Sequence, residues 1–176
     1  MKRISFLTTF SVIALFSLVL YMASCKPDPC KTRAVECNNG GTCKDGDCIC
    51  AAGYEGDSCQ FKVNKKFNSF YACIRSRIVN NATIPDDNDD TLHVKALDDK
   101  FAIQFFSVRD STYEVLHATV NGNYITIPDQ TNTYFGESYE YNGTGSLNNG
   151  VLTITLFETW IGHPWTAKTT YVGYKY

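Results

Sequence analysis

Short apolar runs separated by turn residues occupy the chain from residue 67 onward, and no stretch shows the 3.6-residue period of an amphipathic helix. Leu152, Ile154 and Leu156 alternate with threonines, a pattern typical of a strand with one face on a core. The pattern predicts about eight strands, at residues 67–79, 92–97, 101–108, 113–120, 124–127, 135–141, 151–157 and 169–174.

Two short turn signals indicate how these strands pair. Asn121-Gly122 predicts a type I′ hairpin before Tyr124, and Asn149-Gly150 predicts a second hairpin before Val151. Neighbouring strands should therefore pair antiparallel in sequence order, as a meander. Because exposed strand edges must be hidden, we expect residues 67–176 to close into a lipocalin-like barrel, with a β-sandwich as the alternative.

The N-terminal residues have the pattern of an export signal. Lys2 and Arg3 precede an apolar run at residues 10–22, and small residues follow at Ala23 and Ser24. This order predicts a secretory signal peptide at residues 1–24. A membrane-spanning helix from residue 4 to 23 is the alternative, but serines and threonines inside the run weaken it.

Ala23-Ser24-Cys25 resembles the lipobox of bacterial lipoproteins, although Met22 stands where that family most often has leucine. The resemblance implies that Cys25 is acylated, for example with palmitate, and anchors the protein to a lipid bilayer. Lys26 rather than aspartate follows the cysteine, which by resemblance to lipoproteins of bacteria with two membranes implies transport to the outer membrane, and we expect display on the cell surface. The alternative is that Cys25 is not acylated and forms a disulfide with another cysteine.

Six of the eight cysteines fall within residues 30–59, which predicts a disulfide-stabilised module rather than a zinc site. The segments Asn38-Asn39-Gly40-Gly41-Thr42-Cys43 and Cys48-Ile49-Cys50-Ala51-Ala52-Gly53-Tyr54-Glu55-Gly56-Asp57-Ser58-Cys59 resemble the EGF-like family closely. That resemblance implies the pairs Cys30–Cys43, Cys37–Cys48 and Cys50–Cys59. Residues 25–29 would then be a lipidated tether, and residues 60–66 a linker to the β domain.

Calcium-binding EGF modules carry acidic residues before the first cysteine, and here Lys26-Pro27-Asp28-Pro29 occupies that place. We therefore expect no metal in the module. It would act as a rigid spacer or, alternatively, as a protein contact surface.

The β domain resembles, more loosely, domains that follow EGF-like units in lipoproteins of Bacteroidota. The resemblance lies in the segments 117–128 and 142–147, and those families have poorly defined activities.

The composition is typical of a globular protein rich in strands. It includes 11 Tyr and 11 Phe, and the formal charge of -2 becomes about -4 when Lys2 and Arg3 are removed with the signal. Because the sequence has no stripe of basic residues, we do not expect the protein to bind nucleic acid. The three histidines show no metal spacing and no catalytic arrangement. We therefore expect that the protein binds no cofactor and catalyses no reaction.

Two further features have simple structural interpretations. Cys73, the cysteine left over, should be a buried small apolar residue, although an unpaired thiol could also form an intermolecular bond or act as a nucleophile. Asp86-Asp87-Asn88-Asp89-Asp90 resembles a calcium loop at first, but Thr91 and Leu97 occupy the positions where an EF-hand needs glycine and glutamate. A solvated acidic loop is the expectation.

Both tryptophans, Trp160 and Trp165, flank His163 between the last two predicted strands, at the place of a barrel mouth. They can form a stacking platform for a sugar or an apolar ligand, or else close the end of the barrel. Tyr139 and Tyr141 share one strand face and have the same two interpretations.

These features predict a non-catalytic binding or adhesion protein on the cell surface, with an unknown protein or glycan partner. The alternative is a carrier of a small apolar ligand inside the barrel.

Overall fold

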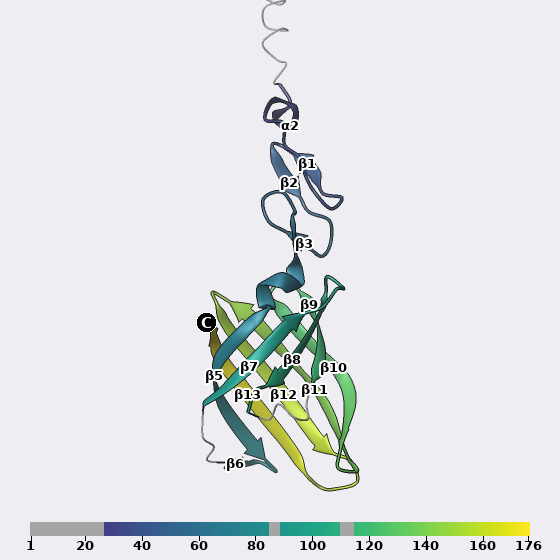
Figure 1. The fold of residues 1–176 in the computed structure, drawn as a ribbon, viewed down its shortest axis with the longest axis vertical. Coiled ribbons are helices and arrows are strands. Elements are labelled where there is room, and N and C mark those ends of the chain that lie inside the picture. Colours follow the sequence, from purple (N-terminus) through teal and green to yellow (C-terminus); the bar gives the residue numbers. More distant parts are fainter. Residues whose placement is uncertain (1–26, 85–88, 110–114) are drawn as a thin grey trace, which may run out of the picture.

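The computed structural model describes residues 27–84, 89–109 and 115–176, which form a small disulfide-bonded module followed by a β-barrel (Figure 1). Within these residues, no helix is long and apolar enough to cross a membrane. The predicted signal at residues 1–24 and the acylation site at Cys25 lie outside the described residues.

The N-terminal module consists of short elements connected by three disulfides. They are α2 (Pro29–Thr32), β1 (Thr42–Lys44), β2 (Asp47–Ile49), β3 (Tyr54–Glu55) and β4 (Phe61–Lys62), with β1 paired to β2 and β3 paired to β4. The disulfides join Cys30 to Cys43, Cys37 to Cys48 and Cys50 to Cys59, the same pairing that the EGF-like resemblance implies. Covalent bonds replace the large apolar core that a module of this size lacks.

Residues 60–66, expected to be a linker, form part of the structure on both sides of the junction. Phe61 and Lys62 complete the β3–β4 pair, and the 3-10 helix η1 (Val63–Phe67) inserts into the end of the barrel. Val63, Asn64 and Phe67 are buried there. The apolar side chains of Val63 and Phe67 explain the difference, because they are covered only if η1 packs onto the barrel.

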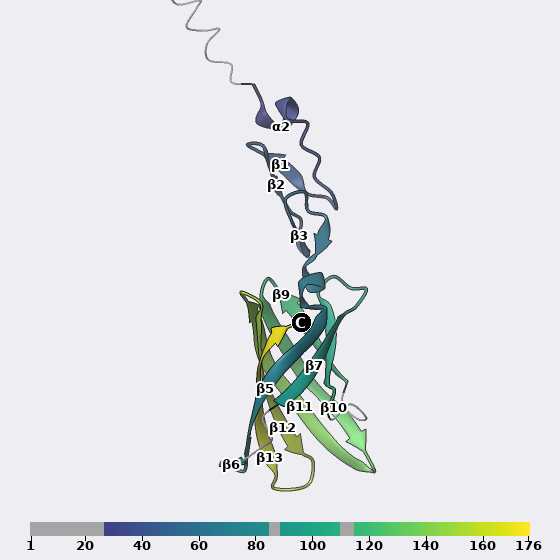
Figure 2. The ribbon, with the colours of Figure 1, turned by 60° about the vertical axis from the view of Figure 1, so that its left-hand side comes forward.

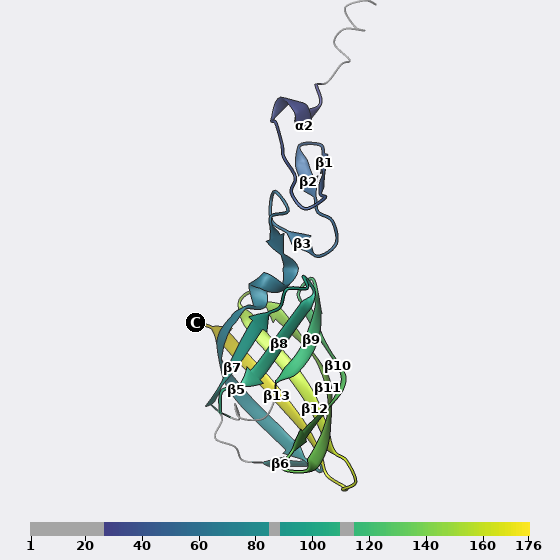
Figure 3. The same ribbon diagram turned by 45° about the vertical axis from the view of Figure 1, so that its right-hand side comes forward.

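Polar contacts fix the two units relative to one another. The Lys62 ammonium donates to the Asp98 carbonyl at 2.8 Å, and Lys66 forms an ion pair with Glu55 at 2.9 Å. Lys100, in a loop of the barrel, lies 4.8 Å from the centre of the Tyr54 ring in the module. The module therefore continues the barrel as one elongated body, and Figures 2 and 3 show η1 at the same end of the barrel from two further directions.

The barrel contains eight antiparallel strands in sequence order, closed by pairing of the first with the last. The strands are β5 (Ser69–Val79), β7 (Asp89–Ala96), β8 (Ala102–Ser107), β9 (Leu116–Asn121), β10 (Tyr124–Tyr134), β11 (Glu137–Asn148), β12 (Val151–Trp160) and β13 (Thr166–Lys175). A short strand, β6 (Ala82–Ile84), pairs with the end of β5. This closed meander confirms the predicted barrel, and the sandwich alternative is wrong.

Each predicted strand corresponds to one barrel strand, but several are longer than expected. β10 continues beyond Ile127 through a bulge before Gln130, and β11 continues through Gly143 and Gly145. Both glycines face the interior opposite β12, where a Cβ atom would collide with the β12 backbone. Glycine in these strands thus allows close strand packing rather than marking a turn.

The turns follow the predicted chemistry with one shift of register. Asn149 and Gly150 both have positive φ, as a type I′ hairpin requires. At the β9–β10 turn, Asn121 pairs with Tyr124, so the loop residues are Gly122 and Asn123 rather than Asn121 and Gly122. Gly122 has a φ of 58° at the first loop position, as in a type II′ turn.

The interior has an apolar part and a polar part. Near η1, the lumen is filled by buried side chains that include Phe67, Tyr71, Phe105 and Ile125. Farther from η1, the inward positions of β5 change from Tyr71 and Cys73 to Arg75 and Arg77. The end of the barrel away from the EGF-like module is therefore the polar end.

Candidate functional site

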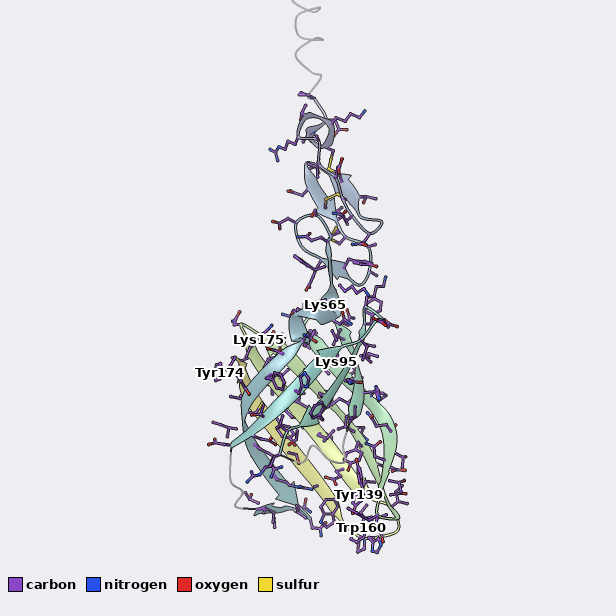
Figure 4. The ribbon with its side chains drawn as sticks, in the orientation of Figure 1. Lys65, Lys95, Tyr139, Trp160, Tyr174 and Lys175 are labelled. Atoms are coloured by element: carbon purple, nitrogen blue, oxygen red, sulfur yellow. A yellow bond between two sulfur atoms is a disulfide. The ribbon has the colours of Figure 1, made fainter. Side chains whose placement is uncertain are left out.

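A cavity of about 470 Å³ opens at the end of the barrel opposite the EGF-like module. We call it the mouth cavity, and it is lined by Arg77, Tyr134, Phe135, Glu137, Tyr139, Leu156, Glu158, Trp160, Trp165, Thr169 and Tyr171. Figure 4 shows Tyr139 and Trp160 at this end, whereas Lys65, Lys95 and Tyr174 lie near the module. The volume is within the range of small-molecule pockets, about 300 to 1,000 Å³.

Strand register brings the aromatic walls of the mouth cavity together. Tyr139 on β11 pairs directly with Trp160 on β12, and their rings stack with centres 5.9 Å apart. Trp165, just before β13, meets Tyr139 edge to face at 6.3 Å. Because the rings differ in orientation, they form two walls rather than one flat platform.

An ion pair supplies the polar side of the mouth cavity. Arg77 on β5 donates to Glu158 on β12 at 2.9 Å, and its guanidinium lies 5.4 Å from the centre of the Trp165 ring. The Arg77 Nε is buried and has no hydrogen-bond partner among the described residues. This donor is therefore a buried polar atom that the described residues leave unsatisfied, beside the mouth cavity that Arg77 lines.

Glu137 orients the indole of Trp160. Trp160 Nε1 donates to the Glu137 carboxylate at 2.9 Å, and His163 Nε2 lies 3.8 Å from the same oxygen. The His163 ring stacks on Trp160 with centres 3.7 Å apart. His163 thus supports the tryptophan and does not line the cavity.

Phe135 has an unusual position at the rim of the mouth cavity. It is 88% exposed and occupies the tip of the β10–β11 hairpin with a φ of 49°. This left-handed conformation favours glycine or asparagine and costs other residues about 1 to 2 kcal/mol. A large apolar side chain that is both exposed and strained is a feature of binding sites rather than of folding.

We expect Phe135→Asn to stabilise the protein and to weaken binding at the mouth cavity. Asparagine tolerates the left-handed conformation, so the unfolding free energy should rise by about 1 kcal/mol. Urea denaturation measures the change, with Phe157→Asn on the outer face of β12 as the control. An equal or lower stability of the Phe135 variant would contradict the assignment of strain.

The five predicted ligand residues divide into three groups in the structure. Tyr139, Trp160 and Trp165 line the mouth cavity, and His163 lies behind Trp160. Tyr141 is fully buried, with its hydroxyl 3.4 Å from Glu158. The tryptophans lie at the mouth as predicted, but they border an open cavity instead of filling the end of the barrel.

The sequence interpretation missed the charged residues of the mouth cavity. Arg77 has the same strand parity as Tyr71 and Cys73, and Glu158 has the same parity as Leu152, Ile154 and Leu156. Extending each alternation by one more step would have placed both charges inside the barrel. The predicted strand at residues 135–141 includes Phe135, but Phe135 lies in the β10–β11 turn, and the following Gly136 is the turn signal in the sequence.

A second polar group lies deeper, between β5, β7 and β8. Asp90 accepts hydrogen bonds from Ser107 at 2.8 and 2.9 Å, and Arg75 lies 3.8 Å from it. The prediction of a solvated acidic loop is wrong for Asp90, which is buried in β7. The alternation of β7 places Asp90 on the same inward face as Leu92 and Val94, while Asp86 to Asn88 lie outside the described residues.

Cys73 is buried in the barrel, as its interpretation as a small apolar residue predicted. Burial raises the pKa of its thiol from the ordinary 9.0 to about 11, and nearby Asp90 contributes. Burial also raises the pKa of the Tyr71 hydroxyl from 10.0 to about 12, with Cys73 contributing. The Cys73 thiol and the Tyr71 hydroxyl therefore stay protonated in the folded protein at pH values at which they are already ionised in the unfolded chain.

Stability should accordingly fall as the pH rises above 9. Below that pH both states hold the Cys73 proton, and between about 9 and 11 only the folded state does, so ionisation favours unfolding. Each group contributes a loss of about 2 to 3 kcal/mol over its range. Urea denaturation from pH 8 to pH 11 measures it, and Cys73→Ala should show a shallower decline. Equal slopes for both proteins would contradict the raised pKa of Cys73.

Comparisons with known proteins define the N-terminal module. The family of teneurin-like EGF domains matches residues 34–62, which include the β3–β4 pair and all the module's cysteines except Cys30. The chain therefore contains an EGF-like domain, followed by a closed eight-stranded barrel of lipocalin-like form. No curated protein and no solved structure matches the chain significantly.

Proposed function

We propose that this chain is an exported, lipid-anchored binding protein that presents the mouth cavity away from the membrane. The position of the lining residues Tyr139 and Trp160 at the end of the barrel opposite the EGF-like module supports this role (Figure 4). Cys25 precedes the module, so an acyl anchor there and the mouth cavity would be at opposite ends of the protein. The module then acts as a spacer.

The contacts at the junction support a spacer of fixed orientation. A flexible connection would let the barrel turn toward the membrane, whereas η1, Lys62 and Lys66 hold the two units in one arrangement. Disulfides inside the module keep its own length constant. The mouth cavity would thus stay at a defined distance from the anchor.

The alternative of an apolar carrier has weaker support. A carrier needs an apolar lumen with room for its ligand, and here Phe67, Tyr71 and Phe105 occupy the apolar part. The remaining space lies at the mouth, beside Arg77 and Glu158. Binding at the mouth is therefore the better assignment.

Two experiments on cells that make the protein test the anchor and its display. Mass spectrometry should find an acylated N-terminal Cys25, and Cys25→Ser should release the protein from the membrane fraction. Protease added to intact cells should remove the barrel, while a periplasmic marker survives. An unmodified Cys25, or a barrel that is cleaved only after the outer membrane is opened, would overturn the proposal.

Affinity capture tests the binding role itself. The wild-type protein should retain a component of cell-surface extracts that a folded Trp160→Ala/Trp165→Ala variant loses. Tyr174→Ala, at the other end of the barrel, serves as the control (Figure 4). Equal capture by wild type and the tryptophan variant would show that the mouth cavity is not the binding site.

A further inference from the structure

We infer that the ligand of the mouth cavity is a neutral sugar unit at the end of a saccharide chain. This inference rests on the proposed binding function and names its ligand class. It follows from three properties of the mouth cavity: the aromatic walls, the balance of charge, and the closed inner end.

The aromatic walls suit a ligand that has flat apolar faces and polar edges. Tyr139 and Trp165 meet nearly at a right angle, with 83° between their planes, so one ring can cover the face of a ligand while the other borders its edge. A pyranose ring combines a C–H face with hydroxyl groups around its rim. Aromatic rings with a few placed polar groups give both kinds of contact.

The charges argue against ionic ligands. Arg77 is already paired with Glu158 at 2.9 Å, and Glu137 adds a second negative charge at the rim, so an anionic ligand would meet net repulsion. A cationic ligand would compete with the Arg77 guanidinium, which lies 5.4 Å from the centre of the Trp165 ring. A neutral ligand avoids both costs and can use the ion pair as a source of donors and acceptors.

Hydroxyl groups fit the hydrogen-bonding capacity that the ion pair leaves. The buried Arg77 Nε needs an acceptor, and carboxylate oxygens of Glu158 can accept from a donor. A hydroxyl group offers both functions within one ligand. A fatty acid or other apolar molecule would instead bury these groups without partners, at a cost in free energy.

The inner end of the mouth cavity is closed, which selects a chain end over an internal segment. Leu156, Thr169 and Tyr171 are buried and lie deeper along β12 and β13 than Trp160 and Trp165. A sugar unit can enter from the mouth but cannot pass through. Phe135, exposed at the rim, is placed to cover its outer side.

Intrinsic fluorescence gives a direct test, because the chain has two tryptophans and both line the mouth cavity. The mature protein is titrated with methyl glycosides of glucose, galactose, mannose and N-acetylglucosamine, with glucuronic acid, choline and lauric acid as comparisons. We expect a saturable change with at least one neutral glycoside, with Kd values of about 1 to 50 mM. Tyr139→Leu should weaken that binding about tenfold, and Tyr174→Leu should leave it unchanged.

A charge variant tests the reason for neutrality. Glu158→Gln removes the partner of Arg77, so the preference for the methyl glycoside over glucuronic acid should fall about tenfold. Glu140→Gln, on the outer face of β11, should retain the wild-type preference. An unchanged preference in the Glu158 variant would overturn the charge argument.

The results separate this inference from the proposed function. A fluorescence response only to lauric acid, choline or glucuronic acid would overturn the sugar assignment while binding at the mouth cavity stands. No response to any probe, combined with capture of a cell-surface component that depends on Trp160 and Trp165, would also overturn it. If no probe changes the fluorescence and capture does not depend on Trp160 and Trp165, the mouth cavity is not the binding site, and the proposed function fails as well.

Discussion

Asn64→Asp is expected to cause a large loss of stability, although it adds almost no volume. The Asn64 side chain is fully buried, and its Nδ2 lies 2.9, 2.7 and 2.9 Å from the carbonyl oxygens of Leu97, Asp99 and Ala102. Aspartate would place a carboxylate oxygen against three acceptors. Lost hydrogen bonds and a buried unpaired charge together should cost more than about 3 kcal/mol.

The defect should be smaller at acid pH. Burial and the facing carbonyls would raise the pKa of the introduced carboxyl group, so its protonated form could donate one hydrogen bond. Lowering the pH should therefore recover part of the lost stability. Urea denaturation followed by tryptophan fluorescence at several pH values measures both effects.

Asn68→Asp is the matched control. Asn68 uses its side-chain oxygen, which accepts from the Ala96 amide at 3.1 Å, and aspartate keeps that acceptor. Its stability should stay close to that of the wild type. If the Asn64 and Asn68 variants prove equally stable, the Asn64 amide does not hold η1 to the barrel.

The second large effect is expected at the buried pair of Arg75 and Asp90. Their side chains are 8% and 0% exposed, and the charges lie 3.8 Å apart within the barrel. Asp90→Asn removes the anion while Arg75 stays charged, and breaking a buried pair in this way costs about 3 to 5 kcal/mol. The inward alternation of β5 and β7 forces both residues into the lumen.

A double-mutant cycle distinguishes the pair from simple packing. Arg75→Met/Asp90→Leu replaces both charges with apolar groups and should lose less stability than the sum of Arg75→Met and Asp90→Leu. Urea denaturation of the four proteins gives the coupling free energy. Additive losses would mean that the two residues contribute independently of each other.

Local sequence patterns predicted most of the fold. Short apolar runs divided by turn residues located part of every barrel strand, and the alternation at residues 152–156 identified the inward face of β12, because successive side chains of a strand point to opposite faces. Asn149-Gly150 located a hairpin, because its turn needs positive φ at both positions. The cysteine spacing and its surrounding residues identified the EGF-like domain.

The junction could not be predicted in the same way. Residues 60–66 contain lysines and an asparagine, a composition typical of a linker. Asn64 is buried only because three carbonyl groups from a loop more than 30 residues away converge on it. Such convergence is a property of the assembled barrel.

The sequence by itself determined the eight barrel strands and the cysteine-rich module, because apolar runs, turn residues and cysteine spacing depend on neighbours along the chain. Only the tertiary structure decided which inward side chains meet. Arg77 and Glu158 are 81 positions apart and pair over β13, which lies between their strands because it closes the barrel onto β5. Tyr139 faces Trp160 because the β11–β12 register sets them opposite each other. Closure and register are cooperative properties of all eight strands, and the mouth cavity is their product.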